Sequence, residues 1–426
     1  MEKNKYWVWL SLIKDLGSRK KQKLLEIYKT PENIYKLNKK ELTVLIVTDF
    51  KMICKGSNIY LKDTTYNTMS RYKKIFGNTI LCTRNYSNDP IDDFVLANDV
   101  VDDVVCISSL FNTLLGKHDS AIKEAVKKSD LVIARVPSIV AYRGARVSYK
   151  ENKPLFSVAI GCAWDAYWNH KFPGKLIAPY MYFQMRWCMK KSDFALYVTN
   201  SFLQERYPST CKSIGVSDVM IQDTNDNIIK ERISTIDNMS YQRITLMTSG
   251  SVGNKAKGQE YMIKAIPILN SRGIKVNYIL AGGDNPTYLK SIARKYNVEE
   301  QVTFMGLLSM SQIYELLDKT DIYIQPSLQE GLPRAVVEAM SRGCPVIGAK
   351  TGGIPELIQN ECIVPRKSSV SLANTIIQIL EREKLKDIAY INFEKSKEYL
   401  ESILSNERNM YYQNIINALD DCKHDK

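Results

Sequence analysis

Two glutamates eight residues apart, Glu330 and Glu338, are the residues whose type and spacing best suit chemistry on a phosphorylated ligand. Glu330 stands in a predicted loop with Gly331 and Leu332, and Pro333 occupies the first position of a predicted helix, where proline is tolerated. The open start of this helix presents free N–H groups and a positive dipole end to a diphosphate. Glu338, further along the helix, can accept hydrogen bonds from both hydroxyls of a ribose. The alternative is that both carboxylates only favour the helix start and face solvent.

A glycine-rich segment before these glutamates supplies candidate cations. Ser251, Lys255 and Lys257 follow the apolar run 244–247 and are interspersed with glycines. A fixed ammonium group beside a leaving diphosphate stabilises the charge that develops there in the transition state. Gly306 follows the apolar run 302–304, in the segment that closes that predicted strand. The alternative is a set of solvated lysines and ordinary turns.

Apolar runs alternate with helix-period segments along most of the chain, which indicates parallel sheets covered by helices on both faces. The stretch from 211 to 241 is polar and predicts a linker that contains one short strand at 219–221. Because ligands bind at the carboxyl ends of parallel strands, we expect the candidate residues to face a cleft between two such units. The predicted strands are 43–49, 79–82, 131–134, 155–160 and 195–198 before the linker, and 244–247, 276–280, 302–304, 321–324 and 345–347 after it.

These patterns divide the 426 residues into five parts, because a chain of this length usually needs more than one core. A basic helical appendage at 1–41 precedes a Rossmann-like domain at 42–215. A linker at 216–242 leads to a second Rossmann-like domain at 243–395, and helices at 396–426 end the chain. The fold class is therefore α/β, with two doubly wound domains that face a cleft.

The segment 321–357 resembles the glycosyltransferases of family 4, which have the two-domain GT-B fold. It carries the Glu-x7-Glu spacing inside Glu-Gly-x-Pro, followed by Gly-x-Pro-Val-Ile and Gly-Gly-x-Pro-Glu. The resemblance implies an enzyme that transfers a sugar with retention from a UDP- or GDP-sugar on the second domain to an acceptor on the first. It implies that Glu338 binds the ribose and that Glu330 lies beside the donor sugar. The acceptor it implies is a growing surface polysaccharide or its lipid-linked precursor.

The same resemblance bears on the basic segment. The family usually places an arginine and a lysine on the diphosphate, and Lys257 with the following glycine matches the lysine position. Ser251 stands where the arginine is usual, and Lys255 is the candidate for the second charge. This departure puts the arginine role in doubt.

In the first domain, Gly56 lies in the predicted loop after the first strand, where similar enzymes use a glycine to approach the phosphate. Many relatives carry a histidine after the strand that ends near 160, whereas this chain has Gly161 and Cys162. Asp165 or His170 could take over those polar contacts, and the alternative for Asp165 is a helix N-cap. The segment 175–191 mixes aromatic, methionine and basic residues. It suits either a membrane interface close to a lipid-linked acceptor or a helix packed under the sheet.

Composition narrows the partners and the compartment. Nine irregularly spaced cysteines and only three histidines argue against disulfides and against a metal cluster, and no Asp-x-Asp stands in a donor loop. We therefore expect a metal-independent reaction without a cofactor in the cytoplasm, with peripheral membrane association as a further possibility. The net charge of +13 favours an anionic partner, although basic composition alone can serve solubility.

Residues 1–41 differ in texture from the rest and contain eleven Lys or Arg against five Asp or Glu. Two short predicted helices joined at Gly17 resemble the N-terminal helices of DprA/Smf-type DNA-processing proteins, while a helical appendage with no DNA role explains the same pattern.

The sequence leaves three other functions open for the chain: a nucleotide-sugar epimerase, a catalytically degenerate transferase and a nucleic-acid-binding protein. Of these, the nucleic-acid-binding function is the one that the sequence does not favour.

Overall fold

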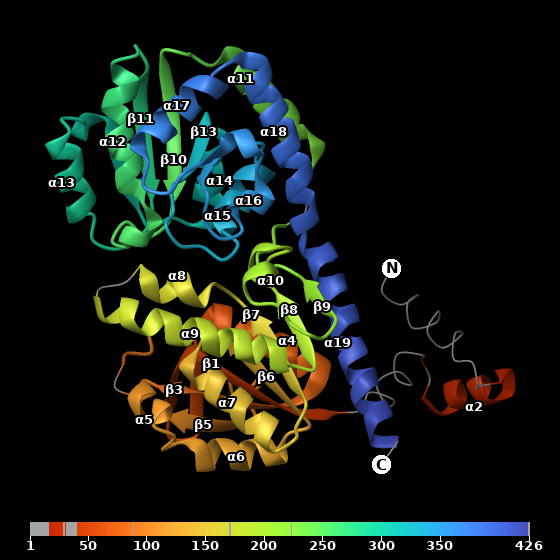
Figure 1. The fold of residues 1–426 in the computed structure, drawn as a ribbon. Helices are drawn as coiled ribbons and strands as arrows, with labels where there is room; N and C mark the ends of the chain where they lie inside the picture. The colour runs from red at the N-terminus through yellow and green to blue at the C-terminus, as the bar shows by residue number, and fades with distance from the viewer. Residues whose placement is uncertain are drawn as a thin grey trace.

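The computed structural model describes residues 17–28, 30, 41–87, 89–169, 172–222 and 224–424. Two α/β domains lie one above the other and are separated by a cleft (Figure 1). Of the basic appendage, the described part is helix α2 (Ser18–Tyr28), which begins directly after Gly17. The helix predicted before Gly17 lies outside the described residues.

The N-terminal domain is built on a parallel sheet in the order β5-β3-β1-β6-β7-β8-β9. The apolar runs predicted as strands form its centre, where β6 and β7 are buried at every residue. The strands are β1 (Leu42–Lys55), β2 (Asn58–Leu61), β3 (Gly77–Asn85), β4 (Val95–Leu96), β5 (Asp103–Ile107), β6 (Leu131–Val136), β7 (Leu155–Ala159), β8 (Phe194–Tyr197) and β9 (Ser213–Gly215). The helices are α4 (Asp63–Phe76), α5 (Leu110–Leu114), α6 (Asp119–Lys128), α7 (Ile139–Lys150), α8 (Ala163–Trp168), α9 (Phe172–Lys191) and α10 (Phe202–Arg206).

Strand β1 is twice as long as the sequence pattern predicts. From Met52 to Lys55 it forms an antiparallel hairpin with β2, which in turn pairs with β4. The register between β1 and β3 shifts between Val47 and Lys51, and the parallel pairing resumes at Lys51 and Met52. The residue predicted to lie in a loop beside the cleft, Gly56, therefore stands in the hairpin turn, in the left-handed conformation with a φ of 61°.

The C-terminal domain has a parallel sheet in the order β12-β11-β10-β13-β14-β15, which is the doubly wound order of a Rossmann fold. Its strands are β10 (Arg243–Ser249), β11 (Lys275–Ala281), β12 (Val302–Gly306), β13 (Ile322–Gln325), β14 (Val346–Ala349) and β15 (Ile363–Val364). Its helices are α11 (Asp226–Asn238), η1 (Lys255–Lys257), α12 (Gln259–Asn270), α13 (Thr287–Lys295), η2 (Glu299–Gln301), α14 (Met310–Asp318), α15 (Arg334–Ser341), α16 (Ile354–Leu357), η3 (Asn360–Cys362), α17 (Ser369–Ile379) and α18 (Arg382–Ser396).

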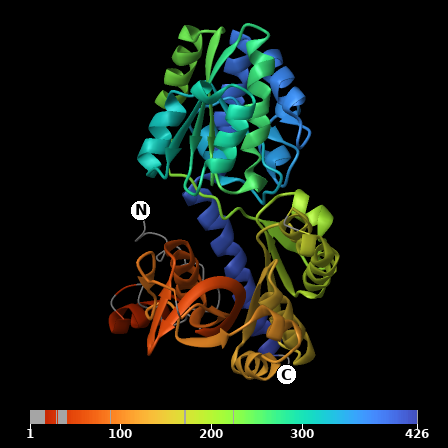
Figure 2. The same ribbon diagram turned by 90° about the vertical axis from the view of Figure 1, so that its left-hand side faces the viewer.

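The last helix, α19 (Glu401–His424), crosses back to the N-terminal domain after the short turn η4 (Lys397–Tyr399) (Figures 1 and 2). The ring of Tyr412 packs 5.3 Å from that of Phe76 on α4 and 5.9 Å from that of Phe156 on β7, measured between centroids. The N-terminal domain is thus completed by residues that the sequence pattern places in a separate helical end. Sequence position alone does not show this, because the contacts join residues more than 250 positions apart.

Two segments connect the domains and lie side by side. The backbone N–H of Ile221 donates to the carbonyl of Tyr399 at 3.0 Å, and the N–H of Glu401 donates to the carbonyl of Ile221 at 2.9 Å. The strand predicted at 219–221 is reduced to this single bridge between Ile221 and Leu400. Among the described residues, no helix has the length and apolar character needed to cross a bilayer.

Candidate active site

A pocket of about 720 Å³ opens in the C-terminal domain at the carboxyl ends of its strands. The start of α15 forms one wall, because Leu332, Pro333 and Arg334 line the pocket. Pro333 is the N-cap rather than the first helical residue, and no side chain caps the helix, so its first amides are left uncapped at the pocket wall. The opposite wall comes from the loops after β10, β11 and β12, which are glycine-rich or short. An uncapped helix start in a pocket suits an anionic ligand.

Glu338 lies on the pocket wall with its side chain 9% exposed. Its nearest charged partner is Arg334 on the same helix, whose Nε lies 3.8 Å from a carboxylate oxygen. No hydrogen bond of this carboxylate to another described residue is present. Burial raises the pKa of Glu338 above its ordinary value, and the charge of Arg334 opposes the rise. A buried carboxylate with one distant partner is costly unless a ligand supplies hydrogen-bond donors.

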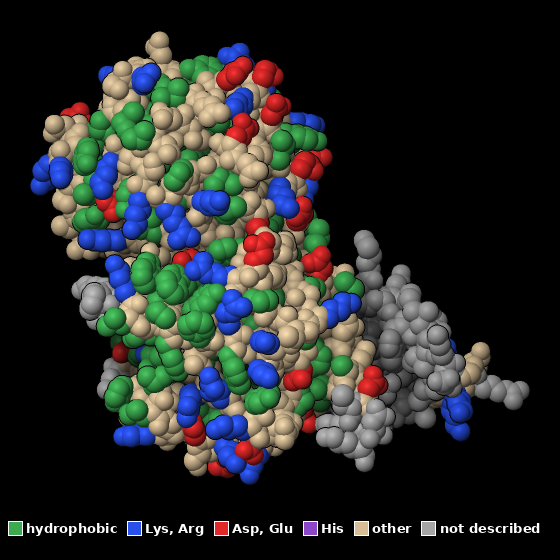
Figure 3. All heavy atoms as spheres, viewed as in Figure 1, with side chains coloured by type: hydrophobic (Ala, Val, Ile, Leu, Met, Phe, Trp, Pro, Cys, Tyr) green, Lys and Arg blue, Asp and Glu red, His purple; other side chains and the backbone are tan. Residues whose placement is uncertain are grey.

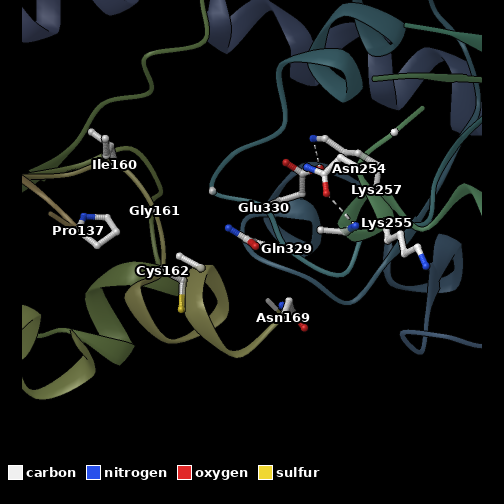
Figure 4. Close-up of a pocket in the computed structure, with 14 residues that line it drawn as sticks. Pro137, Ile160, Gly161, Cys162, Asn169, Asn254, Lys255, Lys257, Gln329 and Glu330 are labelled. Atoms are coloured by element: carbon white, nitrogen blue, oxygen red, sulfur yellow. Dashed lines mark hydrogen bonds and ion pairs between the residues drawn. The ribbon is translucent and has the colours of Figure 1, made fainter. Parts of the chain in front are cut away.

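A second pocket of about 700 Å³ lies between the two domains (Figure 4). The N-terminal domain contributes the ends of β6 and β7 and the start of α8, through Pro137, Gly161 and Cys162. The C-terminal domain contributes η1 and the loop after β13, including Gly331. The lining residues from the first domain are uncharged, whereas those from the second include Lys255, Lys257 and Glu330.

Lys257 and Glu330 line both pockets, so they stand where the two pockets meet. Figure 4 shows their side chains pointing toward one another, and Lys257 Nζ lies 2.9 Å from Glu330 Oε1. Gln325, at the end of β13, donates to the same oxygen at 3.0 Å through its amide. Two donors therefore hold the glutamate carboxylate in place beside the buried end of β13.

The turn after β10 depends on glycine. Gly258 has a φ of 67°, and a Cβ there would lie 2.1 Å from the carbonyl oxygen of Pro326, so a side chain would displace the loop after β13. Ser251 lines the pocket of the C-terminal domain, and its hydroxyl donates to Asp284. Lys255 lines the pocket between the domains, but its Nζ lies 3.8 Å above the ring centroid of Tyr288. Of the two predicted lysines, Lys257 is therefore the one whose ammonium group reaches the meeting point of the pockets.

Three predicted residues lie outside both pockets. Gly306 ends β12 with a φ of 70°, and its neighbours 307 and 308 line the pocket in its place. Gly56 stands in the β1–β2 hairpin turn, so the prediction that it approaches a phosphate is not supported by its position. Asp165 is buried at the third position of α8, where its backbone N–H donates to the Cys162 side chain that caps the helix. His170 lies outside the described residues.

Asp165 makes an ion pair across the cleft instead of facing the pocket. Its carboxylate lies 3.5 Å from a guanidinium nitrogen of Arg366, which follows β15 in the other domain. The structure thus gives Asp165 a contact between the domains, and its predicted catalytic role stays a prediction. The N-cap alternative is wrong because Cys162 is the cap. Asn169 makes a further contact between domains by donating to the carbonyl of Leu328 at 3.2 Å.

Sequence reasoning missed a contact between the domains that involves several hydrogen bonds to one carboxylate. Glu356, on α16, accepts hydrogen bonds from the backbone N–H groups of Asn200 at 2.6 Å, Ser201 at 3.1 Å and Phe202 at 2.7 Å. These amides begin helix α10, whose own N-cap residue makes no side-chain hydrogen bond to the helix. The glutamate belongs to the Gly-Gly-x-Pro-Glu motif, so a signal was present, but its partner could not be deduced from the sequence.

Residues 237–408 match the family described as glycosyl transferases group 1. Over 386 residues, which are 88% of this chain and 93% of the relative, the chain is 29% identical to Protein CapJ of Staphylococcus aureus. A shorter match of 137 residues, 30% of this chain and 34% of the relative, is 32% identical to the amylovoran biosynthesis glycosyltransferase AmsK of Erwinia amylovora. The relatives thus include enzymes of polysaccharide biosynthesis.

The fold is that of known GT-B proteins. HepE of Anabaena, solved in complex with UDP, superposes with a TM-score of 0.59 and 15% sequence identity over 90% of this chain and 100% of that one. This similarity supports the predicted architecture of two Rossmann-like domains. Across the described ranges, the structure contains no group of three His, Cys, Asp or Glu side chains arranged to hold a metal ion.

Proposed function

We propose that this chain, whose residues 237–408 match the family described as glycosyl transferases group 1, transfers a sugar from a UDP- or GDP-sugar to a saccharide or lipid-linked saccharide, with retention of configuration. One observation carries the proposal. Lys257 and Glu330 stand where a pocket made only by the C-terminal domain meets a pocket shared by both domains. This is the position that the reacting carbon must occupy when donor and acceptor come from opposite sides.

The C-terminal pocket has the groups that a nucleoside diphosphate requires. The carboxylate of Glu338 is buried and without a hydrogen-bond donor among the described residues, so a ribose diol can satisfy it. The uncapped start of α15 and the ammonium of Lys257 suit the diphosphate. Ser251 and the neighbouring glycine loop give this part of the ligand backbone and hydroxyl contacts in place of an arginine.

In the proposed reaction, the bond between the anomeric carbon and the diphosphate oxygen breaks, and the nucleoside diphosphate leaves with the electron pair. Lys257 stabilises the negative charge that grows on that oxygen. The acceptor oxygen bonds to the anomeric carbon and gives up its proton to the leaving phosphate or to solvent. Glu330, held by Gln325, lies beside the sugar and stabilises the positive charge that develops at the ring. We propose that retention arises within this geometry, by same-face attack or through a covalent intermediate.

The proposed reaction uses no cofactor and no metal ion, because the cation beside the diphosphate is Lys257 and the helix α15 supplies the remaining partial positive charge. Transfer in buffer containing EDTA should equal transfer in buffer containing magnesium. A strict requirement for a divalent cation would show that a further group is needed at the diphosphate.

The acceptor is proposed to lie on the N-terminal side of the shared pocket, where Pro137 and Gly161 leave the wall open. The similarity to AmsK, a relative named for amylovoran biosynthesis, supports a polysaccharide or its precursor as the acceptor class. We place the reaction in the cytoplasm, as the sequence predicts.

A thermal-shift screen against UDP, GDP, ADP and their sugars tests the donor site. One nucleotide family should raise the melting temperature of the wild type, and Glu338→Gln should abolish that rise. Product analysis with the stabilising sugar nucleotide then separates the alternatives. Transfer that Glu330→Gln abolishes supports the proposal, whereas donor turnover without an acceptor supports an epimerase. Binding without turnover supports a degenerate transferase.

A further inference from the structure

Helix α9 and its neighbours expose an unusual amount of apolar surface on one side of the N-terminal domain. The exposed fractions are 69% for Leu176, 66% for Phe183 and 40% for Tyr180 on α9, and 42% for Trp168 at the end of α8. Figure 3 shows hydrophobic side chains gathered over α8 and α9, with Lys and Arg side chains beside them. We call the surface of α7, α8 and α9 that carries these residues the α9 face.

The exposed apolar residues are not the ones that hold α9 to the domain. The inner side of the helix packs under the sheet through a separate set of fully buried residues: Ala178, Met181, Met185, Cys188 and Met189. The outer stripe at 176, 180 and 183 follows helical spacing on the opposite side. A helix that is apolar on both sides needs a second apolar environment for its outer side.

All charged residues on the helices α7 and α9 are basic. Helices α7 and α9 together contain seven Lys or Arg residues and no Asp or Glu. Among them, Lys190 and Lys191 are exposed at the end of α9. The acidic residues just beyond the helices are already engaged: Glu151 pairs with Lys123 at 2.7 Å, and Asp193 accepts from the backbone N–H of Leu155 at 2.8 Å.

Aromatic and basic side chains are also in contact on this face. The Nζ of Lys191 lies 5.1 Å from the ring centroid of Tyr149, and the guanidinium of Arg186 lies 5.7 Å from that of Tyr182. Such pairs, beside exposed aliphatic residues, match the boundary between lipid headgroups and acyl chains, where aromatic rings and basic groups both concentrate.

The α9 face adjoins the pocket between the domains. Helix α8 begins at that pocket, where Cys162 and Ala166 line it, and ends at the exposed Trp168. An acceptor whose lipid part stays in a membrane beneath Leu176 and Phe183 is therefore only one short helix away from the pocket. This consequence rests on the proposed function, whereas the binding of the face to lipid does not.

We propose that the α9 face binds the surface of a bilayer containing anionic lipids. The apolar stripe at 176, 180 and 183 inserts among the acyl chains, while the basic end of α9 contacts the headgroups. Because the face is uniformly positive, an anionic bilayer is favoured over a second copy of the chain, which would place the same basic residues against one another.

Flotation of the full-length protein with vesicles tests the proposal, without any sugar nucleotide present. Vesicles of phosphatidylcholine with phosphatidylglycerol should carry the protein, and vesicles of phosphatidylcholine alone should carry little. Lys190→Gln with Lys191→Gln should lower the partition coefficient roughly 25-fold, since each basic residue near an anionic surface contributes about fivefold. Leu176→Ser with Phe183→Ser should lower it by at least about tenfold.

Val370→Ser with Tyr390→Ser is the matched control, because these residues are 58% and 57% exposed on helices α17 and α18 of the other domain. The control should bind as the wild type does, and all variants should keep the wild-type melting temperature. Absence of flotation with anionic vesicles, or unchanged flotation of both α9 variants, would overturn the proposal. A wild-type dimer that Leu176→Ser with Phe183→Ser converts to a monomer would assign the face to a second copy instead.

Discussion

Replacing Glu356 by alanine should separate the two domains without disturbing the donor pocket. The carboxylate accepts three backbone N–H groups and the hydroxyl of Ser201, all from the start of α10 in the opposite domain. The helix has no side-chain cap of its own, so the glutamate is a cap supplied from the other domain. Its loss leaves these amides to water and removes a contact that only the closed arrangement can make.

The expected cost follows from the number and setting of these bonds. A hydrogen bond to a charged group contributes about 1.5–3 kcal/mol when solvent is excluded. The bonds of Glu356 are partly open to solvent, which reduces each contribution, and the substitution of one N-cap costs about 1 kcal/mol. We therefore expect the closed arrangement to lose about 2 kcal/mol, which shifts the equilibrium between closed and open domains about 30-fold.

Two measurements check this reasoning in the full-length protein. The turnover number of Glu356→Ala should fall by up to about 30-fold, and its radius of gyration in small-angle scattering should increase. The affinity for the nucleotide should change less than about twofold, because the donor pocket is lined by the C-terminal domain alone. Glu356→Gln, which keeps one acceptor oxygen, should lie between the wild type and alanine.

Glu383→Ala serves as the control, because this glutamate is on the same domain with its side chain 76% exposed. It should leave turnover and scattering unchanged. The reasoning would be refuted if Glu356→Ala kept the wild-type turnover and scattering. It would also fail if nucleotide affinity and turnover fell by the same factor, since the glutamate would then act through the donor pocket.

Three further predictions concern individual charged side chains. Glu338→Gln should raise the melting temperature of the ligand-free protein at pH 7, because burial raises the pKa of this carboxyl and its ionised form is disfavoured in the folded state. The folded state binds the proton of Glu338 more tightly than the unfolded state does. The gain in melting temperature should therefore appear as pH rises through the folded-state pKa and vanish well below pH 4.5. A lower melting temperature of Glu338→Gln at pH 7 would contradict this prediction. Lys257→Ala should lower the turnover number about 10²- to 10³-fold. Because the ammonium group of Lys255 lies over Tyr288, Lys255→Ala should lower the turnover number less than about threefold. Equal losses in steady-state assays would show that both lysines serve the diphosphate. Asp218→Asn should lower the free energy of unfolding in urea by about 2 kcal/mol. Burial disfavours the charged carboxyl, but three neighbouring guanidinium groups lower its pKa, and the substitution removes their counter-charge. The side chain is partly exposed, so the loss is smaller than for a fully buried pair, and a loss below about 0.5 kcal/mol would show that the cluster is solvated.

The geometry of the candidate site in the second domain could be predicted in large part because its residues are close together in the chain. Strand β13, the loop with Glu330, and helix α15 with Glu338 span only residues 322–341. A strand, a tight loop and a helix start constrain one another locally, so residue type and spacing carry the geometry. The same holds for the turn with Lys257, where the glycine at 258 is needed for close backbone approach.

The sites in the first domain were less predictable for the opposite reason. Whether β1 ends near residue 49 or continues to Lys55 depends on its pairing with β2, and that pairing carries Gly56 away from the cleft. The position of Asp165 depends on Arg366, two hundred residues later. Such outcomes are decided by partners that no local pattern specifies.

The sequence by itself determined two parallel α/β units and an open helix start followed by a carboxylate, since hydrophobic periodicity and loop chemistry act over a few residues. Only the tertiary structure decided that α19 completes the first domain, that Glu356 caps a helix across the cleft, and that Lys257 and Glu330 stand where the two pockets meet. These features arise from contacts between residues far apart in the chain, whose free energies appear only when both domains are folded and packed together.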